Sequence, residues 1–234
     1  MNTKFVLICV LMASLQTGCN LASPTMVPTT LLPEAPTLEF VEPAAIQTVL
    51  PTHLPTTISI QPSATPLSTN QEVLDEAAEV IAALKNEDMT ILSGYVHPRL
   101  GLRSSPYAFV RDTDQVFLAD EVASLLIDSK VYTWGHYSGS GAPIDLGFPA
   151  YYSQFVYDVD FANATQMALN HRLGVSTSMD NSLEFYPGTM IVEYYFPGFD
   201  PQFQGMDWRS LRLVFMEDNN TWYLVGIIHD QWTT

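Results

Sequence analysis

The clearest periodic pattern of hydrophobic and polar positions begins near residue 69 and predicts an amphipathic helix. Thr69 and Glu72 have the spacing of a capping box. Apolar residues then recur every three or four positions, which is the period of one helix face: Val73, Ala77, Val80, Ile81 and Leu84. Asp88 can cap a second, shorter helix that contains Met89, Ile91 and Leu92. We therefore expect this region to begin with two helices.

The middle of the chain has patterns of both kinds, with helical stretches on either side of a strand. The predicted elements, in chain order, are a helix over 120–127, a strand over 130–137, a helix over 151–157 and a further helix within 160–169.

Strand-like patterns dominate the last third of the chain. The stretch 189–196 predicts one strand, and 208–216 with 221–230 predicts a hairpin around a polar four-residue turn. Predicted helices at the start of the domain and predicted strands at its end indicate an α+β domain that finishes with a long C-terminal hairpin.

The register of this hairpin assigns its side chains to two faces. If Glu217 pairs with Trp222 and the pairing stays regular, Ser210 lies opposite His229 and shares a face with Arg212. One face is core-like: Leu211, Leu213, Phe215, Trp222, Leu224 and Ile228. The other has the apolar and polar mixture of a pocket lining: Ser210, Arg212, Val214, Met216, Tyr223, Val225, Ile227 and His229. A shift of one residue would exchange partners and faces.

Composition separates the chain into a domain over 71–234 and a different N-terminal part. The domain carries 22 acidic and 8 basic residues, so 8 − 22 gives a net charge of −14. Such a surface repels phosphate backbones, and we expect no nucleic-acid partner.

The first 19 residues resemble a bacterial lipoprotein signal peptide. An apolar run over 5–15 is too short to span a membrane, and Thr17 and Gly18 precede Cys19 as small residues do in a lipobox. Gln16 departs from the leucine usual in that motif. The resemblance implies that Cys19 receives acyl chains, palmitate among them, and anchors the protein in the cell membrane on its extracytoplasmic side. The alternative is an ordinary secretory signal with an incidental cysteine.

Residues 20–70 have the composition of a disordered stalk. They contain nine of the sixteen prolines and neither Lys nor Arg. Removal of the signal would take Cys9 with it and leave only Cys19, so we expect no intramolecular disulfide.

The element order of 71–234, together with the stretch DMTILSGYVHP, resembles the NTF2-like fold. This resemblance implies N-terminal helices packed on a curved, mainly antiparallel sheet. The chain is also similar to bacterial lipoproteins that share its VHP…SPY, YTWG…GSG and WYLVGIIHDQW stretches, a resemblance that implies no activity. NTF2-like folds include both enzymes and binding modules, so the fold does not decide the function.

Candidate chemistry centres on His229. On an apolar face beside Arg212, with Glu193 or Tyr195 nearby, it could act as a general acid or base. The alternative is a buried structural histidine and an Arg212–Glu193 ion pair. The histidines of the domain lack metal-ligand spacing, and we expect neither a metal nor a cofactor. We also expect His97 to support a loop and Arg103 to bind backbone carbonyl groups in that loop.

The residues predicted to bind a ligand combine rings with polar groups: Trp134, His136, Tyr195, Arg212 and His229. Aromatic residues at this density also commonly fill a core. Three functions remain open. The first is a non-catalytic module that binds a small ligand or an envelope partner. The second is an enzyme of the isomerase or hydrolase kind with a His–Arg pocket on the concave sheet face. The third is a structural adaptor whose own side chains fill the pocket.

Overall fold

The computed structural model describes residues 69–175 and 178–233. The predicted signal, Cys19 and nearly all of the predicted stalk lie outside the described residues. Within the described ranges, no helix has the length and apolar character needed to cross a bilayer. The elements, in chain order, are α1 (Thr69–Lys85), α2 (Met89–Tyr95), β1 (Leu102–Ser105), β2 (Gln115–Phe117), α3 (Ala119–Val122), η1 (Leu125–Ile127), β3 (Val131–His136), β4 (Pro143–Gly147), α4 (Phe148–Phe155), η2 (Phe161–Asn163), β5 (Gln166–Leu169), α5 (Ser182–Phe185), β6 (Met190–Phe196), η3 (Pro201–Phe203), β7 (Arg209–Asp218) and β8 (Thr221–Gln231).

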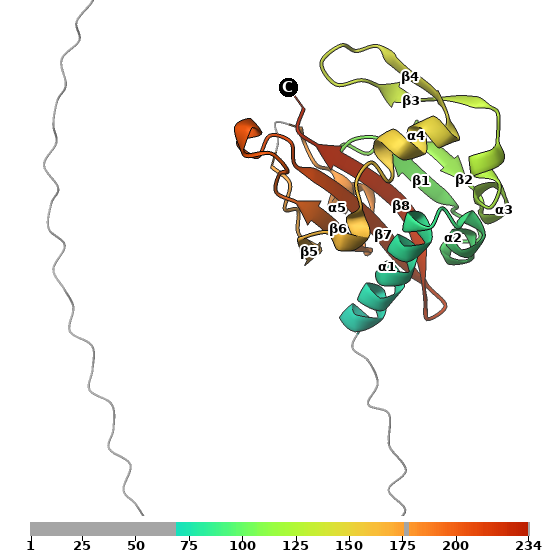
Figure 1. The fold of residues 1–234 in the computed structure, drawn as a ribbon. Coiled ribbons are helices and arrows are strands. Elements are labelled where there is room, and N and C mark those ends of the chain that lie inside the picture. Colours follow the sequence, from blue (N-terminus) through green and yellow to red (C-terminus); the bar gives the residue numbers. More distant parts are fainter. Residues whose placement is uncertain (1–68, 176–177, 234) are drawn as a thin grey trace, which may run out of the picture. The chain divides into compact units, whose positions relative to one another are not determined.

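A curved six-stranded sheet forms the centre of the domain, in the order β2-β1-β8-β7-β6-β5 (Figure 1). Its described neighbours are antiparallel except β1 and β8, which run parallel. Strands β3 and β4 form a separate two-stranded ribbon. The expected α+β class, with N-terminal helices on a mainly antiparallel sheet and a long terminal hairpin, is confirmed.

The two faces of the sheet are covered by different elements. Helices α1, α2 and α4 pack on one face, where α1 buries the apolar stripe that its sequence predicts (Figure 1). The second face has a smaller apolar cluster, in which Tyr186, next to α5, packs on Val214 and Ile228. Segments 106–114 and 178–186 reach this second face, and the Asn181 side chain joins them through two hydrogen bonds to the backbone of Val110.

Two predicted helices in the middle of the chain are wrong in part. The stretch 120–127 forms two short pieces, α3 and η1, in place of one helix. The stretch 160–169 contains only the short η2, and its second half is the outer strand β5, which pairs with β6. Pairing with β6 supplies hydrogen bonds between distant parts of the chain, and a local helical pattern cannot reveal them.

A β-bulge changes the predicted register of the terminal hairpin. Glu217 pairs with Trp222 as expected, but Phe215 pairs with Leu224 while Val214 pairs with Gly226. Val225 is therefore the extra residue, and all pairs beyond it shift by one position. The predicted pairing of Ser210 with His229 is wrong: Ser210 pairs with Asp230, and Leu211 pairs with His229.

Candidate functional site

The bulge separates the two residues that the sequence placed in one pocket. His229 is fully buried on the α4 face, where its ring packs edge-on against Phe155 at 5.8 Å and its Nε2 lies 3.2 Å from Asp158 Oδ1. Arg212 is 2% exposed and lies on the opposite face of the sheet, beside the cluster around Tyr186. The expected His229–Arg212 pocket is therefore wrong, because one extra residue in β8 reverses the side on which His229 points.

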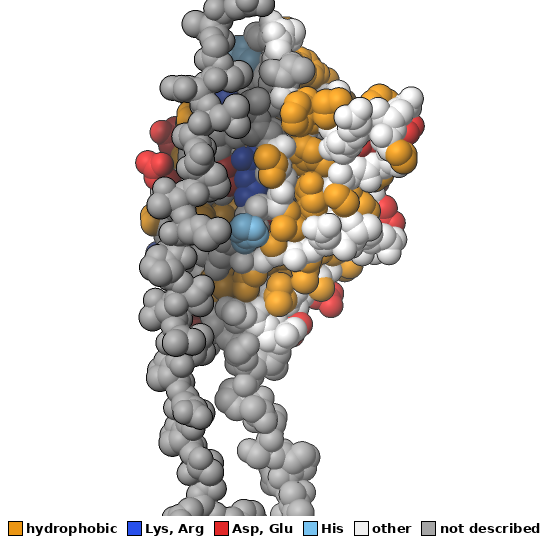
Figure 2. Space-filling view, turned by 90° about the vertical axis from the view of Figure 1, so that its left-hand side faces the viewer, with side chains coloured by type: hydrophobic (Ala, Val, Ile, Leu, Met, Phe, Trp, Pro, Cys, Tyr) orange, Lys and Arg blue, Asp and Glu red, His pale blue; other side chains and the backbone are white. Residues whose placement is uncertain are grey.

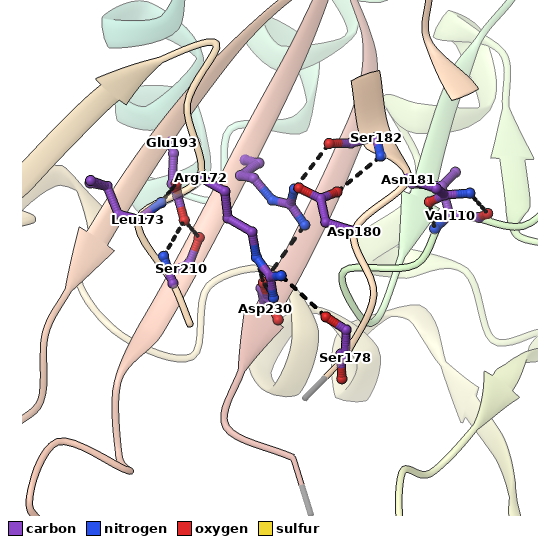
Figure 3. Close-up of polar contacts among 12 residues, drawn as sticks. Val110, Arg172, Leu173, Ser178, Asp180, Asn181, Ser182, Glu193, Ser210 and Asp230 are labelled. Carbon is purple, nitrogen blue, oxygen red and sulfur yellow. Dashed lines mark hydrogen bonds and ion pairs between the residues drawn. The ribbon is translucent and has the colours of Figure 1, made fainter. Parts of the chain in front are cut away.

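Glu193, the third catalytic candidate, is also fully buried and bound to other groups. It lies opposite Arg212 in the register, yet its Oε1 accepts a hydrogen bond from Ser210 Oγ at 2.5 Å. Its Oε2 accepts the backbone N–H of Leu173, also at 2.5 Å (Figure 3). The expected Arg212–Glu193 ion pair is replaced by these contacts, which attach the 170–175 segment to β6 and β7.

Arg212 belongs instead to a partly buried ionic cluster with Arg172, Asp180 and Asp230 (Figure 3). Its Nη1 donates to Asp180 Oδ2 at 2.8 Å and to Ser182 Oγ at 3.1 Å. Asp230 Oδ2 accepts from Nε and Nη2 of Arg172 at 3.0 and 2.6 Å. The cluster holds two positive and two negative groups, so it is balanced in charge.

The environment shifts the pKa values of the two aspartates in opposite directions. Burial raises the pKa of Asp230, although both arginines oppose this shift. Burial also acts to raise the pKa of Asp180, but the charge and hydrogen bond of Arg212 outweigh it, and the net shift is downward. Asp180 therefore stays ionised near neutral pH as the direct partner of Arg212.

A small recess opens beside this cluster. Its volume is about 230 Å³, including space open to solvent, and its walls include the charged Arg172, Asp180 and Arg212 and the apolar Leu183 and Ile191. Figure 2 views the domain from the side on which β5 lies and shows basic and histidine side chains next to many exposed hydrophobic ones. Several large apolar residues between positions 167 and 206 are exposed: Met167, Val175, Met179, Leu183, Phe199, Phe203 and Met206.

A second, wider cleft lies beside α4, on the same face of the sheet as His229. Its volume is about 880 Å³, including space open to solvent. Asp158, which follows α4, connects the buried His229 to this cleft and also accepts a hydrogen bond from Arg209 Nε at 2.7 Å. Burial acts to raise the pKa of Asp158, but His229 and Arg209 together lower it below its ordinary value.

The walls of the cleft combine aromatic rings with hydrogen-bonding groups. Tyr107 and Tyr137 pack against Phe155 with ring centroids 5.7 and 6.2 Å apart. The Tyr137 hydroxyl donates to Gln154 Oε1 at 3.2 Å. Further polar wall residues are Ser138, Ser153, Asp158, Arg209 and Gln231. Rings beside amides, hydroxyl groups and an ion pair can hold a small polar ligand.

The remaining predicted ligand-binding residues lie apart from each other. Trp134 is 1% exposed, stacks on Tyr151 at 3.6 Å and donates from Nε1 to the Leu146 carbonyl, so it is a core residue. His136 is exposed on β3, whereas Tyr195 is half-buried on β6 against Trp208. The structure does not bring the five predicted residues into one site.

One of the two expected supporting roles is confirmed. His97 Nδ1 accepts the backbone N–H groups of Arg99 and Leu100, which fixes the turn after α2. Arg103 Nη1 donates to three backbone carbonyl groups, but these lie in the 111–114 segment and not in the loop of His97, so the expected location is wrong. Among the described residues, no group of three or more His, Cys, Asp or Glu side chains is arranged to hold a metal ion.

Sequence reasoning missed the residues that shape the cleft and the ionic cluster. Asp158 and Arg209 lie 51 positions apart, and Arg172 and Asp230 lie 58 apart. No periodic pattern or motif joins residues at such distances. The available signal was that Asp158 directly follows the predicted helix over 151–157, but this does not identify a partner.

Comparison with known proteins gives limited similarity. No protein-family model matches this chain, and no curated protein matches it. One similar solved structure is a Xanthomonas campestris protein assigned as a calcium/calmodulin-dependent protein kinase II association domain. It has a TM-score of 0.32 and 8% identity, over 70% of this chain and 88% of that one. Another, named Rd1NTF2_05 with five substitutions, has a TM-score of 0.29 and 11% identity, over 68% of this chain and 98% of that one.

Proposed function

We propose that this protein is a lipid-anchored extracytoplasmic binding module that holds a small polar ligand, of the saccharide class, in the cleft lined by Tyr107, Tyr137 and Gln231. The observation that carries the proposal is the composition of this cleft, in which aromatic rings lie beside amides, hydroxyl groups and the Arg209–Asp158 pair. Aromatic faces suit the apolar face of a sugar ring, and the polar groups suit its hydroxyl groups.

The same geometry favours binding over catalysis. The only carboxylate that lines the cleft, among the described residues, is Asp158. Burial acts to raise the pKa of Asp158, but His229 and Arg209 outweigh this effect and lower it. Asp158 is therefore a weak base near neutral pH. His229 itself is fully buried behind Asp158, and Arg212 and Glu193 lie away from the cleft. General-base catalysis would need a group with a higher pKa in contact with the substrate.

In this arrangement the domain would lie at a distance from the membrane. Acyl chains on Cys19 would hold the N-terminus, and residues 20–70 would form the tether, with a full reach on the order of 150 Å. The domain charge of −14, from 22 acidic and 8 basic residues over 71–234, would disfavour contact with anionic headgroups.

Native mass spectrometry of the full chain, purified gently from its own host, tests ligand binding directly. We expect a reproducible mass excess that disappears on denaturation and has the mass of a saccharide. Gln154→Ala removes an exposed amide from the cleft and should weaken binding about tenfold, while Gln71→Ala, an exposed helical glutamine outside the cleft, should not. A bare chain mass, or equal binding by both variants, would contradict the proposal.

An envelope protein is a second candidate ligand, and the side of the domain near β5 favours it. Strand β5 is an outer strand, and Met167 on it is 53% exposed. Phe199, Phe203 and Met206 are each about half exposed in the 197–207 segment. Outer strands with exposed apolar residues bind partner chains readily. Met167→Glu should abolish co-purification of such a partner while the thermal midpoint of the protein stays unchanged, and a partner retained by this variant would exclude the surface.

A further inference from the structure

The β3–β4 ribbon is separate from the six-stranded sheet, and its tip lines the cleft (Figure 1). We propose that this ribbon tip, residues 137–142, is a lid that is hinged at Gly135 and closes over the ligand in the cleft. Tyr137 and Ser138 belong to the tip and form part of the cleft wall. This inference rests on the proposed function, because it concerns how the same cleft holds its ligand.

The base of the ribbon is fixed to the core of the domain. Trp134 on β3 is 1% exposed and stacks on Tyr151 of α4 at 3.6 Å. Ile144 on β4 is fully buried. Residues 131–133 pair with 145–147 in a regular antiparallel register. The base therefore cannot move unless these buried rings and chains separate.

Both strands of the ribbon are interrupted between this base and the tip. On β3 the register shifts between Thr133 and His136, and Gly135 within the shift has a φ of 120°, which residues with a Cβ rarely adopt. On β4, His136 pairs with Pro143, which has no N–H to donate to its partner strand. A register shift on one strand and a missing donor on the other weaken the pairing here, so the hinge lies at this point.

The ribbon tip makes few described contacts with the rest of the domain. Every tip residue after Tyr137 is exposed. The Tyr137 hydroxyl donates to Gln154 Oε1 at 3.2 Å, and the Ser138 N–H donates to the Tyr107 hydroxyl at 3.3 Å. The Tyr137 ring also packs on Phe155 at 6.2 Å. Both hydrogen bonds are long and exposed, so water competes with them and the tip can leave this position more easily than the base can.

The tip keeps its own shape when these contacts break. The Tyr137 N–H donates to the Ala142 carbonyl at 2.8 Å, and the Gly141 N–H donates to the Tyr137 carbonyl at 2.9 Å. Because these bonds lie within the tip, it can tilt as one piece. A ligand that binds both to the tip and to Gln231 favours the closed position and shifts the population toward it.

Distances measured by double electron–electron resonance on the full chain test the hinge without a ligand. Spin labels are attached at Ala142→Cys and Glu79→Cys, two exposed positions, in a chain that carries Cys9→Ser and Cys19→Ser. We expect a broad or two-peaked distribution, because the free tip occupies more than one position. Labels at Val131→Cys and Glu79→Cys are the control for the fixed base and should give one narrow peak. Equally narrow distributions for both pairs would overturn the proposal.

Two matched tyrosine substitutions test what holds the tip. Tyr137→Phe removes the hydrogen bond to Gln154, so the ratio of undocked to docked tip should rise about threefold. Tyr132→Phe removes a hydroxyl at the base that donates to Asp128 at 2.6 Å, and it should leave the distribution unchanged. The same change in both variants, or in neither, would overturn the assignment of the hinge.

Saccharide probes distinguish a failure of the lid from a failure of the proposed function. Glucose, N-acetylglucosamine and maltose are added to the chain labelled at 142 and 79, and native mass spectrometry of the same samples reports which of them binds. We expect a bound saccharide to reduce the distribution to a single distance. A bound saccharide that leaves it broad would overturn the lid while the proposed function stands. A bare chain mass with every probe would contradict the proposed function, and the distances without ligand would still decide whether the tip is hinged.

Discussion

Asp160 shows how a single side chain can join three segments of the domain. Its carboxylate accepts hydrogen bonds from Lys85 Nζ at 2.8 Å, from the Tyr157 hydroxyl at 2.7 Å and from Asn163 Nδ2 at 2.7 Å. Lys85 ends α1, and Asn163 ends η2, so the contact fixes where the first helix meets the middle of the chain. These partners favour the charged form and lower the pKa of Asp160 to about 2.

This lowered pKa predicts how Asp160 responds to acid. A lowered folded-state pKa adds stability above the ordinary aspartate value of about 3.9, and that contribution is lost as pH falls toward about 2. NMR titration of the side-chain carboxyl should give a midpoint near 2 in the wild type. Lys85→Met removes the leading cause and should move the midpoint upward.

Lys130→Met is the matched control, because Lys130 contacts Tyr132 and has no described contact with Asp160. A midpoint near 4 in the wild type, or the same shift in both lysine variants, would contradict the assignment of the ion pair.

At the scale of elements, the bulge in β8 determines which side chains share a face. Gly226 lies at the bulge opposite Val214, and a Cβ added there would come 2.8 Å from the Tyr186 hydroxyl and 3.2 Å from Val214 Cγ2. The absence of a side chain lets Tyr186 pack directly on the strand. The shift in pairing directs His229 toward α4 and leaves Arg212 with the segment around Asp180.

Gly226→Ala should therefore destabilise the domain, by about 1–3 kcal/mol, because the added methyl overpacks this contact. Urea unfolding followed by circular dichroism measures the change. Gly94→Ala is the matched control: Gly94 is exposed in α2, and an added Cβ meets nothing within 4 Å. It should stabilise the protein by roughly 0.5–1 kcal/mol, since alanine is the better helix former. Equal effects of the two substitutions would show that the packing on Tyr186 is unimportant.

For the whole molecule, the decisive question is whether Cys19 is the anchor. Cys9 and Cys19 are the two cysteines of the chain, and the lipoprotein interpretation assigns them different fates. Cys9 would leave with the signal, whereas Cys19 would become the acylated N-terminus. Two or more acyl chains give stable attachment, so the protein should fractionate with membranes.

Cys19→Ser should transfer the protein from the membrane fraction to the soluble fraction of host cells, as measured by immunoblotting after ultracentrifugation. Cys9→Ser should leave the wild-type distribution unchanged, because it alters only the apolar run of the signal. Membrane association that persists in Cys19→Ser would rule out this anchor, and a wild-type protein found only in the soluble fraction would favour the ordinary secretory signal.

The parts of the fold predicted well from sequence are those that local patterns determine. The α1 stripe from Val73 to Leu84 is buried as expected, and Asp88 caps α2 by accepting the Ile91 N–H at 2.9 Å. The strands β6, β7 and β8 also lie where alternation and the polar turn place them. In each case the information lies within a few residues, so neighbouring side chains and backbone groups suffice.

The sequence by itself determined the α+β class, the terminal hairpin, the strong negative charge and the expectation of an anchor at Cys19. Only the tertiary structure decided that His229 faces Asp158, that Arg212 joins Arg172 and Asp230, and that 166–169 is a strand. The physical reason is that one extra residue in a strand reverses every later side chain. Next to this extra residue, Gly226 contacts Tyr186, which lies 40 positions away in the numbering (226 − 186). Contacts over that distance are invisible to periodicity, and the cleft is built from them.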